Sequence, residues 1–181
     1  GFLPAEVDAL CEKFDMDRAE AAQWYDGYVL PHEHHVYNPC SVAQAMTYRS
    51  YGRYWTKTDT FESLLDYINN DLDGVYQDVM SMIGGERIVI DTNSYDNSFT
   101  TPQCKDDCFT LLAHIGYLSY DATTSQVFIP NEEVRMAFRG ALKMCSWPEA
   151  IKPYQRSQKF IEAILAQDTA TVARMVEETH Q

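Results

Sequence analysis

Three histidines and a cysteine lie within one short segment, WYDGYVLPHEHHVYNPCS, and imidazole and thiolate are groups that bind zinc in proteins. His32 and His34 are two residues apart, so an extended backbone would point both side chains to the same side. His35 and Cys40 would come close to them if the chain turns back, and Glu33 would add a carboxylate oxygen. The segment therefore predicts a candidate metal site.

The competing hypothesis is that these histidines decorate a polar, solvated loop. Zinc sites usually draw pairs of ligands from two separate elements, and the sequence shows no second pair. We therefore expect the loop histidines to bind nothing essential.

The motifs WYDGY and VYNP flank this loop and point to a helix–loop–helix corner. An aromatic pair ends one helix, Asp-Gly turns the chain, and Asn-Pro caps and begins the next helix. The predicted corner consists of Trp24, Tyr25, Asp26, Gly27, Tyr28, Tyr37, Asn38 and Pro39.

Apolar periodicity and capping residues predict a mainly helical first part. Asp17 with Glu20 has the form of a capping box, and Asn38-Pro39 begins a helix that Gly52 ends. The expected helices cover 4–14, 17–26, 38–52, 60–70 and 72–85, with a loop over 28–38.

From about residue 71 the order of elements changes to that of a winged-helix unit. We expect a strand at 87–92, a polar loop at 93–103, a helix at 104–116, a β-hairpin at 117–130 and a helix that Asn131 caps. The fold class is therefore mainly α (α+β), a helical bundle followed by a winged-helix-like unit with a small three-stranded sheet. The expected domains are 1–70, 71–145 and trailing helices over 146–181, near 147–166 and 168–180.

The charge of the chain argues against a surface that binds duplex DNA. The net charge is −13, and residues 61–104 hold eight acids and one base. Duplex binding needs clustered Lys and Arg, and the helix at 104–116 carries two adjacent aspartates instead, Asp106 and Asp107. We expect a packing or protein-contact module with no duplex DNA partner.

Other classes of function have little support in the sequence. No apolar run approaches the length of a membrane span, and no leader opens the chain, so we expect no membrane association and a cytoplasmic location. The five cysteines are scattered, which favours reduced thiols. No Ser-His-Asp or Cys-His arrangement stands out.

Several phrases in a fixed order resemble the predicted AAA-ATPase-like family of bacterial proteins. They are GFLPAEV, WYDGY with VYNPCSV, YWTKT, and LLAHIGYLSY with FIPNEEVRMAF, and they span residues 1 to about 140. Members of that family have an N-terminal P-loop ATPase core, a helical and winged-helix-like middle, and a C-terminal PD-(D/E)XK nuclease-type domain. The phrase FIEAILAQDTATVARMV is similar to the lead-in helices of that last domain.

The chain departs from the family at both catalytic ends. It contains no GxxxxGK[ST], and after residue 140 no strand with Asp is followed by Glu-x-Lys. The family usually has Trp where this chain has Cys40, and a short loop without histidines where it has PHEHH. No catalytic residue is carried over, and no cofactor is expected here; ATP and Mg²⁺ are expected only for the parent protein.

The resemblance implies a non-catalytic segment that couples the nucleotide state of an ATPase core to a nuclease-type domain. In such a lid the WYDGY corner would lie near the nucleotide, although packing alone explains its residues. The alternative is a free-standing acidic winged-helix module that contacts another protein. A DNA-binding regulator and a small zinc protein are the remaining hypotheses.

Overall fold

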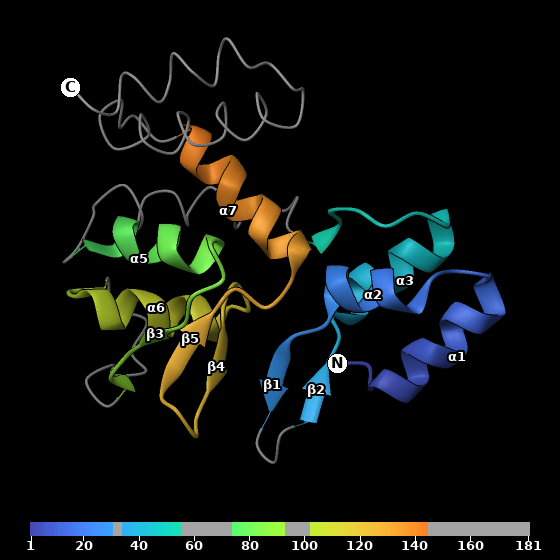
Figure 1. Ribbon diagram of the computed structural model, residues 1–181, viewed down its shortest axis with the longest axis horizontal. Coiled ribbons are helices and arrows are strands. Elements are labelled where there is room, and N and C mark those ends of the chain that lie inside the picture. The colour runs from blue at the N-terminus through green and yellow to red at the C-terminus, as the bar shows by residue number, and fades with distance from the viewer. Residues whose placement is uncertain (31–33, 56–73, 93–101, 145–181) are drawn as a thin grey trace, which may run out of the picture. The chain divides into compact units, whose positions relative to one another are not determined.

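The computed structural model describes residues 1–30, 34–55, 74–92 and 102–144, apart from the side chains of residues 34, 143 and 144. The chain forms two compact units, residues 1–141 and 142–181, and nearly all of the second unit lies outside the described residues. The described part is mainly helical, with six helices and two small antiparallel sheets (Figure 1). This confirms the predicted fold class, a helical part followed by a winged-helix-like unit with a three-stranded sheet.

Three helices build the first part: α1 (Pro4–Phe14), α2 (Arg18–Tyr25) and α3 (Pro39–Tyr48). The Asp17 carboxylate accepts a 2.8 Å hydrogen bond from Glu20 N and begins α2. Asn38 caps α3 in the same way, through a 3.0 Å bond from Cys40 N. Their shared core is made of Val7, Cys11, Ala21, Tyr25, Tyr37, Val42, Ala45 and Met46.

The end of α3 was predicted wrongly. The helix stops at Tyr48 and not at Gly52, because Arg49 takes the left-handed conformation at φ 52° and caps the helix. Ser50 N then bonds to Ala45 O at 3.2 Å, a closing turn that any residue tolerating this conformation can make.

The predicted loop over 28–38 is also corrected, because the structure has a two-stranded hairpin there. Strands β1 (Tyr28–Leu30) and β2 (His34–Val36) pair antiparallel, with Tyr28 opposite Val36. A bridge between Phe2 and Tyr37 extends the pairing to the N-terminal segment. Each strand is only three residues long, so the sequence contains no alternating apolar pattern from which to predict it.

The winged-helix-like unit contains α5 (Val75–Ile83), β3 (Ile88–Val89), α6 (Lys105–His114), β4 (Ser119–Asp121), β5 (Gln126–Phe128) and α7 (Glu132–Met144). Its sheet has the order β3-β5-β4, all antiparallel. The predicted hairpin is therefore confirmed, and the predicted strand at 87–92 is shorter than expected. The guanidinium of Arg87 lies 4.1 Å from the ring centre of Phe128 and 3.3 Å from Asp121 Oδ2, which holds β3 to the hairpin.

Several predictions fall outside the described residues. These are the helix at 60–70, most of the loop at 93–103, the two closing helices and the division near residue 70. In the part of the chain that the structure describes, no helix is both long and apolar enough to cross a membrane. The four described cysteines, Cys11, Cys40, Cys104 and Cys108, are free thiols.

Candidate functional site

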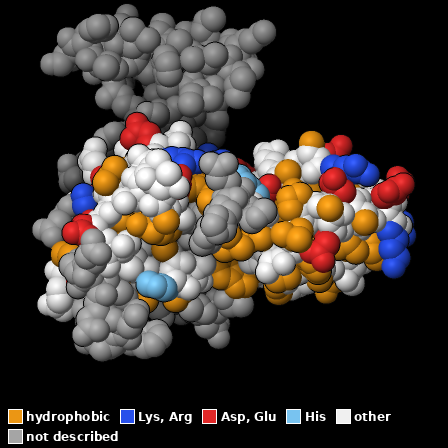
Figure 2. All heavy atoms as spheres, turned by 90° about the horizontal axis from the view of Figure 1, so that it is seen from below, with side chains coloured by type: hydrophobic (Ala, Val, Ile, Leu, Met, Phe, Trp, Pro, Cys, Tyr) orange, Lys and Arg blue, Asp and Glu red, His pale blue; other side chains and the backbone are white. Residues whose placement is uncertain are grey.

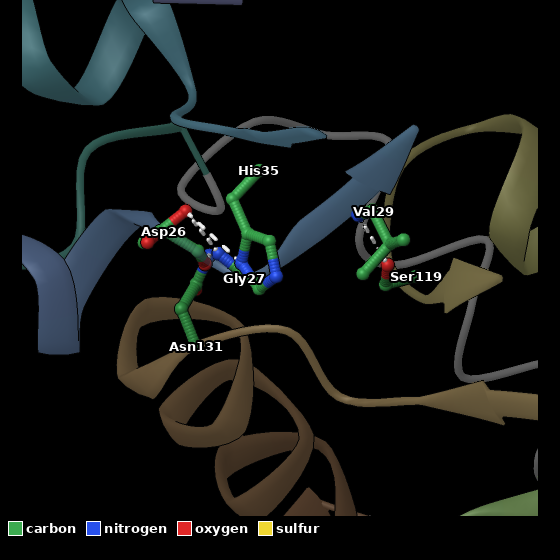
Figure 3. A network of polar contacts seen from close by, with 6 residues as sticks. All are labelled: Asp26, Gly27, Val29, His35, Ser119 and Asn131. Atoms are coloured by element: carbon green, nitrogen blue, oxygen red, sulfur yellow. Dashed lines mark hydrogen bonds and ion pairs between the residues drawn. The ribbon is translucent and has the colours of Figure 1, made fainter. Parts of the chain in front are cut away.

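The Asp26-Gly27 corner lies against the residues that begin α7 (Figure 3). Asn131 donates a 3.0 Å hydrogen bond from its side-chain amide to Asp26 O. Its amide oxygen accepts from Val134 N at 3.1 Å, so one side chain caps α7 and binds the corner. Gly27 is required here, because its φ is +100° and an added Cβ would overlap the carbonyl oxygen of Pro130.

Strand β1 extends these contacts to the three-stranded sheet. Val29 N donates a 3.0 Å bond to the Ser119 hydroxyl of β4, and Tyr28 donates one of 3.0 Å to Gly116 O. Burial raises the pKa of Tyr28, so its hydroxyl stays a donor. The hairpin β1–β2 thus lies beside β4 through a side-chain bond, without a backbone ladder between them.

A buried carboxylate makes the third contact between the helical part and the winged-helix-like unit. Glu133 of α7 is 1% exposed and accepts a 2.6 Å bond from the Ser41 hydroxyl of α3. Its other oxygen accepts from the backbone amides of Tyr54 and Trp55 at 2.6 and 2.7 Å. Such charge-assisted bonds are about twice as strong as neutral ones, so the segment after α3 is fixed to the start of α7 (Figure 1).

Tyr25 holds the same segment from α2. Its hydroxyl donates to Gly52 O at 3.1 Å and accepts from Gly52 N at 3.0 Å, and its side chain is fully buried. Trp55 then packs its ring 5.0 Å from that of Tyr117. We call the set Asp26, Gly27, Tyr28, Asn131 and Glu133 the joint.

All eight residues of the predicted corner are described, and the structure gives each a packing or capping contact. Trp24 packs on the helical core, Tyr37 is 6% exposed, and Pro39 occupies the first turn of α3. Burial raises the pKa of Tyr37 to about 12. Their proximity to a nucleotide, the other hypothesis for this motif, stays a prediction.

The four predicted metal ligands are only partly described. His32 and the side chain of His34 lie outside the described residues. Nδ1 of His35 is 3.9 Å from Asp26 Oδ1, and Cys40 is exposed and accepts from the Gln44 amide at 3.3 Å. Among the described side chains no three His, Cys, Asp or Glu residues are grouped as a metal site, and the hypothesis for the loop stays a prediction.

The polar residues at the start of α6 are engaged within the chain. Asp106 accepts from Asp91 N at 3.1 Å, Asp107 accepts from Gln103 N at 3.0 Å, and Lys105 pairs with Asp78 at 2.8 Å. On the face shown in Figure 2 the described acidic side chains are scattered among hydrophobic and basic ones. The contacts at the start of α6 favour packing of this helix within the chain.

Sequence reasoning missed Glu133, Ser41 and Ser119. The sequence places Glu133 in the first turn of a helix, where an acid is favourable at the surface. Nothing local distinguishes it from Glu132, which is 18% exposed and pairs instead with Arg135 and Arg139. A signal for its burial would have to come from segments far away in the chain.

Comparisons of the chain with protein-family models, with curated proteins and with solved structures gave no match.

Proposed function

We propose that this chain is a non-catalytic segment of a larger AAA-ATPase-like protein. In that role a helical lid and a winged-helix unit pass the nucleotide state of an ATPase core to a C-terminal nuclease-type domain. Its partners would be that core and that domain. ATP and Mg²⁺ would bind to the parent's core, and the parent would act in the cytoplasm.

The observation that carries the proposal is the buried carboxylate of Glu133. Three donors from α3 and from the segment after it converge on one side chain of α7. A displacement of α3 would therefore move α7 with it, since separating them leaves a buried charge unpaired. A segment that relays motion needs this property, and α7 is the element that leads in sequence to residues 142–181.

The decisive experiment uses the full-length parent protein with Glu133→Ala, and with Glu132→Gln as the matched control. We expect Glu133→Ala to bind nucleotide as the wild type does while the response of its C-terminal domain to nucleotide, followed by hydrogen exchange, is reduced. Glu132→Gln should keep that response. A parent gene without a P-loop, or ATP hydrolysis by purified residues 1–181, would remove the proposal.

The second candidate is a free-standing acidic winged-helix module that contacts another protein. The observation that favours it is the exposure of large apolar side chains, with Tyr48 67%, Val89 65% and Leu3 50% exposed. Sedimentation of residues 1–181 at several concentrations tests one form of it. Concentration-dependent dimers would support the module, and a monomer throughout would leave contact with a different protein as its remaining form.

A further inference from the structure

The corner of the joint contains an Asp-Gly pair, Asp26-Gly27, and such a pair can rearrange without an enzyme. The backbone nitrogen of the glycine attacks the side-chain carboxyl carbon of the aspartate and closes a five-membered succinimide ring. The attack is least hindered at glycine, because no side chain shields its nitrogen. Water then opens the ring to aspartate or to isoaspartate, in which the main chain runs through the former side chain.

The fold requires both members of this pair. Gly27 has a φ of +100°, and an added Cβ would overlap the carbonyl oxygen of Pro130. Oδ1 of Asp26 accepts a 2.7 Å hydrogen bond from Gly27 N and lies 3.9 Å from Nδ1 of His35 (Figure 3). A bulkier residue after Asp26 would slow the rearrangement, and the fold excludes it.

The reacting groups lie next to each other in the folded protein. The carboxyl carbon of Asp26 is one covalent bond beyond the oxygen that accepts from Gly27 N. The Asp26 side chain is 23% exposed, so water reaches the carboxylate. Proximity of this kind promotes a reaction only when the orientation of the groups is also correct.

The orientation of the Asp26 backbone prevents ring closure. A five-membered ring requires Cβ, Cα and C of Asp26 to be nearly coplanar with Gly27 N. The ψ of Asp26 is −174°, so its own backbone nitrogen occupies that plane. Tetrahedral geometry at Cα then puts Cβ well outside the plane, and ring closure requires rotation about the Cα–C bond of Asp26.

Contacts on both sides of this bond oppose the rotation. It would turn the Asp26 carbonyl away from the Asn131 amide, which donates to it at 3.0 Å. It would also move Gly27, which fits closely against the backbone of Pro130. On the other side, Asp26 N donates to Ala22 O at 3.1 Å and is fixed to the end of α2. The rotation therefore requires Pro130 and Asn131 to separate from the corner.

We propose that Asp26-Gly27 is a site of spontaneous isoaspartate formation that reacts when the joint opens. In the open joint Gly27 N bonds to the carboxyl carbon of Asp26, and the carboxyl hydroxyl leaves with the amide proton as water. A second water then adds to the main-chain carbonyl carbon of Asp26, and the bond from that carbon to Gly27 N breaks. One water leaves and one enters, so the mass of the chain is unchanged.

The product would prevent the joint from closing again. Isoaspartate lengthens the main chain by one methylene carbon, so Gly27 would no longer fit against Pro130. The carbonyl that accepts from Asn131 would become a free carboxylate. This inference goes beyond the proposed relay function and does not rest on it, since it requires only the contacts of the corner.

The test incubates the full chain, residues 1–181, in buffer and in denaturing urea. Peptide mapping with electron-transfer fragmentation quantifies isoaspartate at position 26 over time. We expect position 26 to react at least about tenfold more slowly in buffer than in urea, because only the open joint reacts. In urea it should react about as fast as Asp73, which glycine also follows.

Two variants distinguish opening of the joint from unfolding of the whole chain. Asn131→Ser removes the amide that binds Asp26 O and should raise the rate in buffer roughly 5- to 30-fold, with no change in urea. The matched control is Gly85→Ala, which strains the backbone after α5, outside the joint, and should raise the rate much less. Urea titration of both variants shows that they are folded in buffer and compares their stability.

A third variant assigns the product to its position. Asp26→Glu should give no detectable product at position 26, because the corresponding ring has six members and closes far more slowly.

Three results would overturn the proposal. The first is an equal rate in buffer and in urea, and the second is a lack of isoaspartate at position 26 in urea. The third is an equal acceleration by Gly85→Ala and Asn131→Ser at equal loss of stability, since unfolding of the whole chain would then expose the site. None of these results bears on the Glu133 experiment, so the two proposals are separable.

Discussion

Glu133 and Ser41 are joined by a 2.6 Å hydrogen bond although 92 residues separate them in the sequence. The bond is buried and connects the first turn of α7 with the first turn of α3. It means that the helical part and the winged-helix-like unit share a polar contact that neither could satisfy alone. The stability of the whole unit should therefore respond to this one carboxylate.

Replacing Glu133 tests that dependence. Glu133→Ala should lower the free energy of unfolding by about 3–5 kcal/mol, because Ser41 Oγ and the amides of Tyr54 and Trp55 lose their acceptor. Glu133→Gln keeps one oxygen acceptor and should cost about 1–3 kcal/mol. Urea denaturation followed by circular dichroism measures both, and Glu132→Gln, which weakens a partly exposed ion pair with Arg135 and Arg139, should cost less than Glu133→Ala. Equal losses in the free energy of unfolding for Glu132→Gln and Glu133→Ala would contradict the role given to Glu133 in the joint.

Gly27 offers a test of the corner itself. Gly27→Ala should cost roughly 3–5 kcal/mol, since it combines an unfavourable φ of +100° with a clash against the carbonyl of Pro130. Gly85 has the same φ with open space around it, so Gly85→Ala isolates the backbone term at about 1–2 kcal/mol. Thermal unfolding of both variants compares them. Similar losses would mean that contact with Pro130 does not constrain the corner.

Two variants of Asn131 should separate the contribution of helix capping to stability from that of the hydrogen bond across the joint. Asn131→Ser keeps a capping oxygen for Val134 N and removes the amide that binds Asp26 O, so its cost of about 1–2 kcal/mol belongs to the corner. Asn131→Ala loses both bonds and should cost about 2–4 kcal/mol. The comparison uses the same urea titration, and a Ser variant as stable as the wild type would show that the bond to Asp26 is dispensable.

The ionisation of Cys108 should make the free energy of unfolding depend on pH in the alkaline range. Burial raises the pKa of its thiol from 9.0 to about 12 in the folded protein. Below pH 9 both states hold the proton and this contribution is complete; between pH 9 and 12 the unfolded state ionises first, and stability falls by up to about 1.4 kcal/mol per pH unit. Cys108→Ala should show a shallower fall in urea midpoint between these limits than the wild type does. Parallel curves for wild type and Cys108→Ala would rule out this linkage.

Local rules accounted for much of the fold. The caps at Asp17, Asn38 and Asn131 follow from side chains that bond to backbone within three residues. The bounds of α1 follow from Pro4 in its first turn and from the apolar periodicity that ends at Phe14. The hairpin β4–β5 was also predictable, because polar turn residues separate two β-branched and aromatic runs.

What the sequence did not reveal depends on contacts across the chain. The hairpin β1–β2 is stabilised by Val29 bonding to Ser119, 90 residues away, and by Phe2 pairing with Tyr37. The site role of Glu133 depends on Ser41 and Tyr54 in the same way. Helix-capping preferences use the local sequence alone, and they predict a solvated acid at a helix terminus. They contain no information about the backbone amides that approach this acid in the folded protein.

The close fit of Gly27 against Pro130 makes substitutions at two distant positions of the gene depend on one another. A side chain can arise at position 27 only if the backbone around position 130 moves away, and that movement would disturb the bond between Asn131 and Asp26. Related chains should therefore inherit the WYDG and PN segments as a pair, and a chimaera that takes one from a distant relative without the other should fold poorly. Recombination within this gene would be tolerated best where it leaves both segments from the same parent.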